Sequence, residues 1–264
     1  MEKYTAINAK TIDRWVEEGW MWGKPVSEAE CEKARRGEWD VLLTPTKAVP
    51  KEWFPPLKGL KLLGLASGGG QQMPLFSLLG AKCTVMDLSD RQLESESFVA
   101  QRESYDIEIV KADMTLTFPF ENEAFDFIFH PVSNCYIEDV YHVWRECFRV
   151  LRPGGILLAG LDNGINYLFD DDEAGKPLIV TNALPYNPLK NPKQMEKLMQ
   201  DDNGIQFSHT FDEQIGGQLK AGFIILSAYE DYNYDSDENF ASAAAGIPAF
   251  WATKAVKPTA NWSF

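Results

Sequence analysis

Hydrophobic and polar positions along residues 57–160 predict a parallel α/β sheet. Short apolar runs, each the length of one strand, are separated by helical patterns of roughly 10 to 15 residues. Strands that alternate with helices imply βαβ units with right-handed connections. The expected strands are Lys61–Leu65, Cys83–Asp87, Ile107–Lys111, Phe125–Phe129 and Ile156–Gly160, and the expected helices are Gln72–Leu79, Asp90–Glu103 and Val140–Leu151.

The alternation stops in residues 161–205, which contain an acidic run at 170–173 and four prolines. We interpret this stretch as an insertion and the acidic run as a solvated loop. A helix is then expected over Phe211–Lys220, followed by strands at Phe223–Tyr229 and Ala249–Val256. No helical pattern separates these last two strands, so they are expected to pair antiparallel at the edge of the sheet.

The first 56 residues differ from the rest of the chain. A helical pattern covers Ile12–Trp22 with Thr11 as a possible N-cap, and Ser27 with Glu30 has the pattern of a capping box. Four prolines between residues 45 and 56 then indicate a linker. We therefore predict a helical, aromatic cap over residues 1–56 and a main domain over 57–264 that contains the insertion. The tryptophans of this cap either dock it onto the core or form a lid over an acceptor pocket.

Composition narrows the possible partners. The chain has 39 acidic and 25 basic residues and a formal charge of -14, which would repel a phosphate backbone over most of its surface. No apolar run approaches the roughly 18 residues of a membrane span, and the first residues are charged. We therefore expect neither a nucleic-acid nor a membrane partner, and a cytoplasmic location.

The cysteines do not have the spacing of a metal site or a disulfide framework. Cys31, Cys83, Cys135 and Cys147 contain no Cys-x-x-Cys pair and lie in or beside apolar segments. We expect reduced, packed thiols and no metal.

A glycine cluster follows the first expected strand. The turn Ala66-Ser67-Gly68-Gly69-Gly70 lies between a strand and a helix, where backbone N–H groups can approach a ligand closely. Asp87 ends the second strand 19 residues after Gly68, a spacing at which a carboxylate can bind a ribose diol. A structural turn and a helix N-cap are the alternatives for these two features.

Two later strand ends carry further candidates. Asp113 and Met114 follow the third strand, where a carboxylate could bind an adenine edge while methionine packs on the ring; a loop aspartate is the alternative. His130 begins the segment His130-Pro131-Val132-Ser133-Asn134 at the end of the fourth strand. This segment should border the reacting centre, because ligands lie outside the carboxyl ends of strands in open α/β sheets.

Together these segments resemble the class I S-adenosylmethionine-dependent methyltransferases. The resemblance runs through residues 62–70, 85–89, 112–114, 125–129 and 151–155 and covers residues 57–160 well. It implies a three-layer, Rossmann-like sheet of seven strands with an antiparallel last strand, and S-adenosylmethionine as methyl donor. It also implies cofactor contacts from Leu65, Ala66, Ser67, Gly68, Gly70, Asp87, Leu88, Asp113, Met114 and His130.

The first motif departs from the family pattern, which usually has an acid where Gly64 stands and a glycine where Ala66 stands. The missing carboxylate removes one anchor near the methionine end of the cofactor. A methyltransferase fold kept as a binding or regulatory module is therefore an alternative. An NAD(P)-dependent oxidoreductase is a third possibility, since Tyr186 and Lys190 match Tyr-x-x-x-Lys. That pair needs a helix, which the surrounding prolines disfavour.

Methyl transfer from a sulfonium is an in-line displacement that depends mainly on alignment, and a base is needed only for a protonated acceptor. The candidate bases are His130, at a strand end, and His209, where the insertion returns to the core; a structural role is the alternative for each. The segment after the fourth strand lacks the Asn/Asp-Pro-Pro-aromatic motif of DNA amino-methylating enzymes and an acidic metal ligand. We expect a small-molecule acceptor, whose reacting atom the sequence leaves open.

Overall fold

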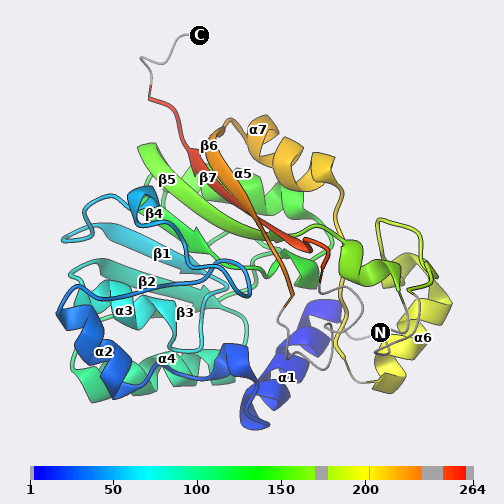
Figure 1. Ribbon diagram of the computed structural model, residues 1–264, viewed down its shortest axis with the longest axis horizontal. Helices are drawn as coiled ribbons and strands as arrows, with labels where there is room; N and C mark the ends of the chain where they lie inside the picture. The colour runs from blue at the N-terminus through cyan, green and yellow to red at the C-terminus, as the bar shows by residue number, and fades with distance from the viewer. Residues whose placement is uncertain (1–2, 170–177, 202, 234–245, 260–264) are drawn as a thin grey trace.

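The computed structural model describes residues 3–169, 178–201, 203–233 and 246–259, which form one seven-stranded sheet flanked by helices (Figure 1). The strands are β1 (Lys61–Leu65), β2 (Lys82–Asp87), β3 (Glu108–Lys111), β4 (Phe125–His130), β5 (Leu151–Asp162), β6 (Ile224–Asp231) and β7 (Phe250–Val256). The α-helices are α1 (Tyr4–Glu17), α2 (Glu28–Arg35), α3 (Gln72–Leu78), α4 (Asp90–Glu103), α5 (Val140–Val150), α6 (Pro192–Asp201) and α7 (Gly217–Ala221).

The strand order is β3-β2-β1-β4-β5-β7-β6. The first five strands in this order are parallel, whereas β7 pairs antiparallel with both β5 and β6. The predicted fold class is therefore confirmed: a Rossmann-like sheet of seven strands whose last strand is antiparallel, with helices on both faces and a helical N-terminal extension.

Alternate residues of each central strand pack on opposite faces of the sheet, as β-strand geometry requires. On one face, Leu62, Phe127 and Leu158 pack against α3 and residues 34–57. On the other face, Leu63 and Ile128 pack against α5. This double burial explains why the strands appear as continuous apolar runs.

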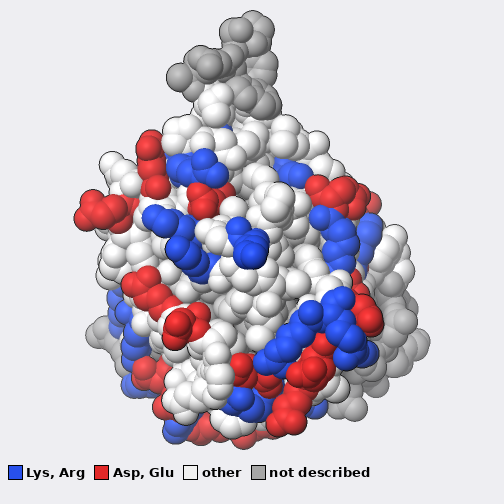
Figure 2. Space-filling model, turned by 90° about the vertical axis from the view of Figure 1, so that its left-hand side faces the viewer, with Lys and Arg blue, Asp and Glu red and all other residues white. Residues whose placement is uncertain are grey.

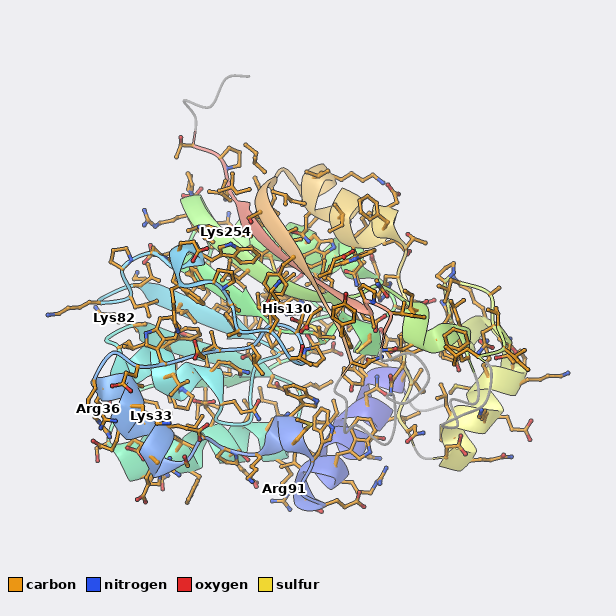
Figure 3. The ribbon with its side chains drawn as sticks, viewed as in Figure 1. Lys33, Arg36, Lys82, Arg91, His130 and Lys254 are labelled. Carbon is orange, nitrogen blue, oxygen red and sulfur yellow. The ribbon has the colours of Figure 1, made fainter. Side chains whose placement is uncertain are left out.

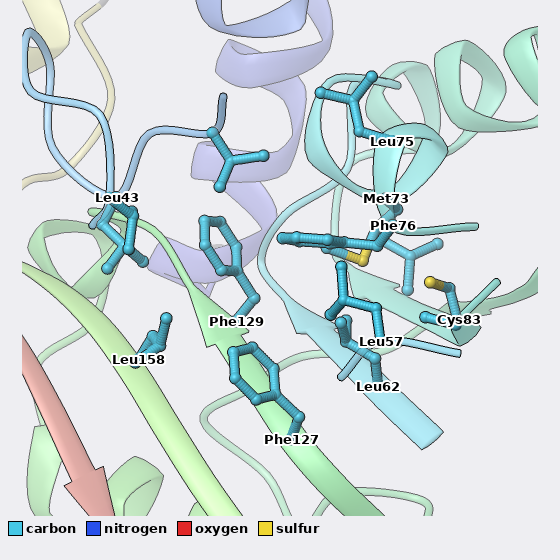
Figure 4. Packing of buried hydrophobic residues seen from close by; sticks show 14 of the residues in the cluster. Leu43, Leu57, Leu62, Met73, Leu75, Phe76, Cys83, Phe127, Phe129 and Leu158 are labelled. Carbon is cyan, nitrogen blue, oxygen red and sulfur yellow. The ribbon is translucent and has the colours of Figure 1, made fainter. Parts of the chain in front are cut away.

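Residues N-terminal to Leu57 contribute to the core. Leu43, Val49 and Trp53 are buried in the same cluster as the sheet, and Leu43 lies beside Phe129 and Leu158 (Figure 4). Its carbonyl accepts the Val132 N–H at 3.0 Å. The division at residue 56 stays a prediction, but residues 41–53 pack on the sheet, whereas a linker was expected.

Helix α1 begins eight residues earlier than the predicted Ile12 and ends at Glu17, so Thr11 lies inside the helix rather than at its N-cap. The hydrophobic pattern was misleading because the buried side chains of α1 are the polar Thr5, Asn8 and Thr11. The capping box of α2, with Ser27 and Glu30, is present as predicted.

The second half of the chain agrees in outline with the expected elements. The helix expected over residues 211–220 is a π-helical turn, Asp212–Gly216, followed by α7.

All four cysteines are buried and free, as expected. Among the described residues, no helix is both long and apolar enough to span a membrane.

Candidate active site

The sheet brings three of the predicted residues together at one edge. Leu65, Asp87 and His130 end the adjacent strands β1, β2 and β4. The connections from β1 and from β4 leave in opposite directions, so a crevice is expected between these strand ends. His130 lies near the centre of the molecule (Figure 3), with its Nδ1 3.0 Å from the Leu65 carbonyl oxygen.

The glycine loop is held by its own backbone donors. The Gly68 N–H donates to Asp87 Oδ2 at 3.1 Å, the Gly69 N–H to the Gln92 carbonyl at 2.8 Å, and the Gly70 N–H to Glu96 Oε2 at 3.1 Å. All three glycine N–H groups therefore point toward the end of β2 and toward α4. These three donors are therefore already satisfied by acceptors within the protein.

Close packing explains the glycines. A Cβ on Gly68 would lie 2.8 Å from the Cβ of Gln92, and one on Gly70 would lie 2.9 Å from the Ser95 carbonyl oxygen. Gly70 also has a φ of +67°, which favours glycine. Ala66 has a φ of 47°, so the alanine that replaces the usual glycine adopts a left-handed conformation.

Asp87 is half-buried and retains hydrogen-bonding capacity. Its oxygens accept the Gly68 N–H and, at 3.0 Å, the Ser89 N–H. Burial raises the pKa of Asp87, although these hydrogen bonds act in the opposite direction. A carboxylate has about four lone-pair positions, so sites remain for the hydroxyls of a ligand. Leu88, the next residue, is half-buried beside this carboxylate.

Asp113 is engaged by the N-terminal segment. Its Oδ2 forms an ion pair with Lys3 at 2.9 Å, and its Oδ1 accepts the N–H and hydroxyl of Thr115. Burial opposes ionisation, but the hydrogen bonds from Thr115 and Lys3 prevail and lower the pKa of Asp113. Met114 is half-buried against the core on the α5 side.

His130 is fully buried, and both of its ring nitrogens have neighbours. Nδ1 faces the Leu65 carbonyl and Nε2 lies 2.9 Å from Asn134 Oδ1. Burial lowers the pKa of His130, despite these two contacts. Neither nitrogen points to open space, which favours a role in holding the ends of β1 and β4 over proton transfer.

Helix α1 joins the two sides of the crevice. On one side, Asp13 accepts the Ser89 hydroxyl at 2.6 Å and the Arg91 N–H at 3.0 Å, and so caps α4 from outside. On the other side, the Asn8 amide donates to the carbonyls of Tyr136 and Ile205 at 3.1 and 2.9 Å and accepts the Ile205 N–H at 2.6 Å. Figure 1 shows α1 between α4 and α6.

The segment after α1 continues onto the glycine loop. The Val26 N–H donates to the Gly70 carbonyl at 2.8 Å, and the Gln71 amide donates to the carbonyls of Met21 and Lys24. The N-terminal residues are therefore part of the wall around the loop.

A cavity of about 330 Å³, the insertion pocket, lies beside the segment that follows β4. His209 lines it and is buried, with Nε2 3.0 Å from the Asn134 carbonyl oxygen. Burial lowers the pKa of His209, although the carbonyls of Asn134 and Ile137 act in the opposite direction. The other lining residues are mostly polar: Glu138, Ala183, Pro185, Tyr186, Asn187, Lys190, Asn191, Gln194, Phe207, Ser208 and Glu213.

The Tyr186 and Lys190 pair does not form an oxidoreductase site. Both residues line the insertion pocket, but a short 3₁₀ turn, Pro188–Lys190, replaces the helix that would put them on one face. This agrees with the effect expected from the prolines.

Asn8, Gln92 and Glu96 were not predicted from the sequence. Asn8 and Glu96 act through partners distant in sequence, and neither stands in a motif. The buried side of α4 mixes the polar Gln92 and Glu96 with the apolar Leu93 and Val99, so periodicity gave no signal for Glu96.

The residues around the loop fit S-adenosylmethionine. The buried Gln92 Oε1 has no hydrogen-bond partner among the described residues, and it lies beside Gly69. Buried polar atoms without partners are rare, and a water or a ligand donor would satisfy this one. The open lone pairs of Asp87 match the ribose hydroxyls.

Comparison with known proteins agrees with this site. Residues 63–159 match the methyltransferase domain family. The chain is 43% identical over 234 residues to the uncharacterized methyltransferase YbaJ of Bacillus subtilis, covering 88% of this chain and 92% of that protein. An S-adenosylmethionine-dependent methyltransferase from Mesorhizobium loti has the same fold, with a TM-score of 0.59 and 17% identity over 78% of this chain and 94% of that one. A putative methyltransferase of this kind from Listeria monocytogenes gives a TM-score of 0.59 at 18% identity, over 79% of this chain and 96% of that one.

The chain belongs to the class I S-adenosylmethionine-dependent methyltransferases. Its cofactor is S-adenosylmethionine, as the sequence motifs implied.

Proposed function

We propose that the protein transfers the methyl group of S-adenosylmethionine to a small polar molecule bound in the insertion pocket. The observation that carries this proposal is the placement of the pocket. Its wall is hydrogen-bonded to the residues directly after β4, through His209 to the Asn134 carbonyl and through the Phe207 N–H to the Cys135 carbonyl at 2.7 Å. Acceptors in open α/β folds bind outside these strand ends.

The cofactor supplies an electrophilic methyl group on a sulfonium, and the chain supplies its orientation. Asp87 would bind the ribose hydroxyls, Asp113 and Met114 the adenine, and Leu88 the neighbouring apolar surface. Ala66 and Gly68 allow close approach to the loop. The full set proposed to hold the cofactor is Leu65, Ala66, Ser67, Gly68, Gly70, Asp87, Leu88, Asp113, Met114 and His130, with His130 acting as a positioning residue.

His209 is the stronger candidate for a general base. Its Nε2–H donates to the Asn134 carbonyl, which leaves Nδ1 as the nitrogen that can accept a proton. Because burial lowers the pKa of His209, the ring is neutral at pH 7 and available as a base. Glu138 and Glu213 line the same pocket and would favour an acceptor with hydrogen-bond donors.

The N-terminal segment is proposed as the cover of this site. Helix α1 is fastened on both sides of the crevice, by Asp13 and by Asn8. A cover that excludes water strengthens the electrostatic interactions inside.

The class of acceptor and the cellular location are also proposals. Acidic and basic side chains are interspersed on the face shown in Figure 2, without a basic stripe. Together with the charge of -14, this favours a small acceptor over nucleic acid. The four buried free thiols favour the cytoplasm.

The first test is ligand stabilisation with S-adenosylmethionine, S-adenosylhomocysteine and NAD. A ligand at 100 times its dissociation constant should add about 2.7 kcal/mol of stability. A response to NAD without one to the adenosyl compounds would overturn the proposal. If the adenosyl compounds bind but no acceptor panel yields demethylated cofactor, the non-catalytic binding module becomes the better description.

The second test concerns the acceptor. For an acceptor found by screening, His209→Ala should lower kcat by about 10²–10⁴-fold when proton removal is required, with S-adenosylhomocysteine affinity unchanged. His142 offers a matched control, because it lies on α5 away from the pocket lining. An unchanged kcat in His209→Ala would remove His209 from the mechanism.

A further inference from the structure

Glu96 is a carboxylate buried behind the glycine loop without a cation. It is 0% exposed, and no lysine or arginine in the described part of the chain forms an ion pair with it. Its oxygens accept the Gly70 N–H at 3.1 Å and the Tyr105 hydroxyl at 3.3 Å. Burying an acid without a counter-charge is costly, so this residue needs an explanation beyond packing.

The usual position of an acid in the first motif is blocked in this chain. A Cβ on Gly64 would lie 2.5 Å from Met73 Sδ, and Met73 is fully buried. The methionine of α3 therefore fills the space that an acidic side chain at position 64 would occupy. The carboxylate that contacts the Gly70 end of the glycine loop in this chain comes from another element.

Helix α4 is that element. It receives two of the three glycine N–H groups, through the Gln92 carbonyl and Glu96 Oε2, while Asp87 receives the third. A side-chain acceptor is needed for Gly70 because α4 approaches it so closely, with Val99 Cγ2 2.9 Å from the place of a Gly70 Cβ. The Gly70 carbonyl is meanwhile fixed by Val26.

We propose that Glu96 is a positioning residue for the cofactor, which holds the Gly70 end of the loop from α4. It touches the loop rather than the cofactor, and its effect passes through the Gly70 N–H. The inference rests on the proposed placement of S-adenosylmethionine on this loop.

Calorimetric titration of the full-length protein with S-adenosylhomocysteine tests the proposal. Glu96→Ala should weaken binding by about 10- to 100-fold, because the Gly70 N–H loses its buried acceptor. Glu96→Gln should restore affinity to within about threefold, since the amide oxygen still accepts the Gly70 N–H. Glu94→Ala is the matched control, because Glu94 lies on the same helix, 62% exposed, and should leave affinity unchanged.

The outcomes separate the two proposals. If the wild-type protein does not bind S-adenosylhomocysteine, the placement of the cofactor fails. If the wild type binds and a folded Glu96→Ala binds equally well, only the role of Glu96 fails.

A second readout holds even if Glu96→Ala does not fold. The amide resonances of Gly68 and Gly70 report separately on Asp87 and Glu96, which accept their hydrogens. The Gly70 resonance should move with pH in the wild type and stay fixed in Glu96→Gln, while the Gly68 resonance moves in both. Asp87, Tyr105 and Cys83 are the titratable groups that interact with Glu96, and all three remain in the variant. A Gly70 resonance that titrates equally in both proteins would overturn the inference.

Discussion

The two sides of the crevice are built from contacts of very different range. On the cofactor side, the loop bonds Gly68 to Asp87 and Gly70 to Glu96, over 19 and 26 residues of sequence. On the acceptor side, Asn8 bonds to Ile205 over 197 residues and Asn134 to Gln214 over 80. The glycine loop with its acceptors is therefore a nearly local structure, whereas the acceptor side exists only after distant segments have met.

This contrast explains where the motifs lie. A strand, a turn and the next strand end can be recognised in one short window, because their geometry fixes residue types such as glycine. Side chains that meet across about 200 residues depend on each other for their contacts. They stand at no fixed spacing in the sequence, so they form no recognisable motif. The cofactor follows from the sequence, and the acceptor does not.

The largest effect is expected from the cofactor side. Gly70→Ala forces a Cβ into the Ser95 carbonyl at a φ of +67° and should destabilise the fold by about 2–5 kcal/mol, combining backbone strain and overpacking. Gly59→Ala is the control, because Gly59 has a φ of +80° with nothing within 4 Å. It should cost only about 1–2 kcal/mol. Equal losses for both variants in urea denaturation would show that the loop is not tightly packed on α4.

Asp162 should make the stability of the fold depend on pH. Burial raises the pKa of Asp162, at the end of β5, to about 7, although its hydrogen bond from Gly164 acts in the opposite direction. The folded protein then binds the proton more tightly than the unfolded chain. The contribution of Asp162 to the free energy of unfolding is fully present below pH 3.8, the ordinary pKa of an aspartate. It is lost as the pH rises toward about 7.

Asp162→Asn removes the loss of stability that ionisation of Asp162 causes at high pH. The variant should be more stable than the wild type by about 2–4 kcal/mol at pH 8, and the difference should shrink toward pH 4.5. Denaturation curves at the two pH values provide the measurement. A difference that is the same at both pH values would show that Asp162 does not titrate in this window.

A binding effect of intermediate size tests the ribose site. Asp87→Ala should weaken S-adenosylhomocysteine binding by about 1.5–3 kcal/mol, because the ribose hydroxyls lose a charged acceptor. Asp90→Ala, three residues later on exposed surface, should change affinity little. Calorimetry decides, and equal affinities for the wild type and Asp87→Ala would reduce Asp87 to a residue that shapes the turn.

The smallest expected effect is a gain in the stability of the protein. Ala66 has a φ of 47°, and glycine adopts this conformation without a steric penalty. Ala66→Gly should therefore stabilise the protein by about 0.5–1 kcal/mol. Thermal unfolding measures this shift, and a lower Tm would mean that the alanine methyl group makes contacts worth more than the strain.

The sequence was sufficient for the sheet and the cofactor. The parallel strands β1, β2, β4 and β5 were predicted because buried parallel strands are continuous apolar runs. The positions of Gly68 and Asp87 were predicted because a phosphate- or nucleoside-binding turn needs glycine. Confirmation of the family and of the antiparallel last strand followed from the structure and the comparisons. The proposed roles of the individual site residues stay predictions.

Other features were beyond the reach of sequence patterns. Helix α1 was misplaced because its buried face carries Thr5, Asn8 and Thr11, and periodicity searches look for apolar residues. Residues 41–53 were expected to be a linker because prolines break helices and strands, but an irregular segment can still bury Leu43 and Trp53. Asn8 and Glu96 are polar side chains whose burial depends on partners that no local pattern shows.

The polar face of α1 also matters for how the chain is made. Synthesis produces α1 before the segments that it joins, and the Asn8 contacts with Tyr136 and Ile205 are complete only after residue 205 has left the ribosome. An apolar helix exposed for that long would favour aggregation. A helix whose buried positions are threonine and asparagine can stay exposed to water without favouring aggregation. Its full set of hydrogen bonds forms only when both sides of the crevice are present.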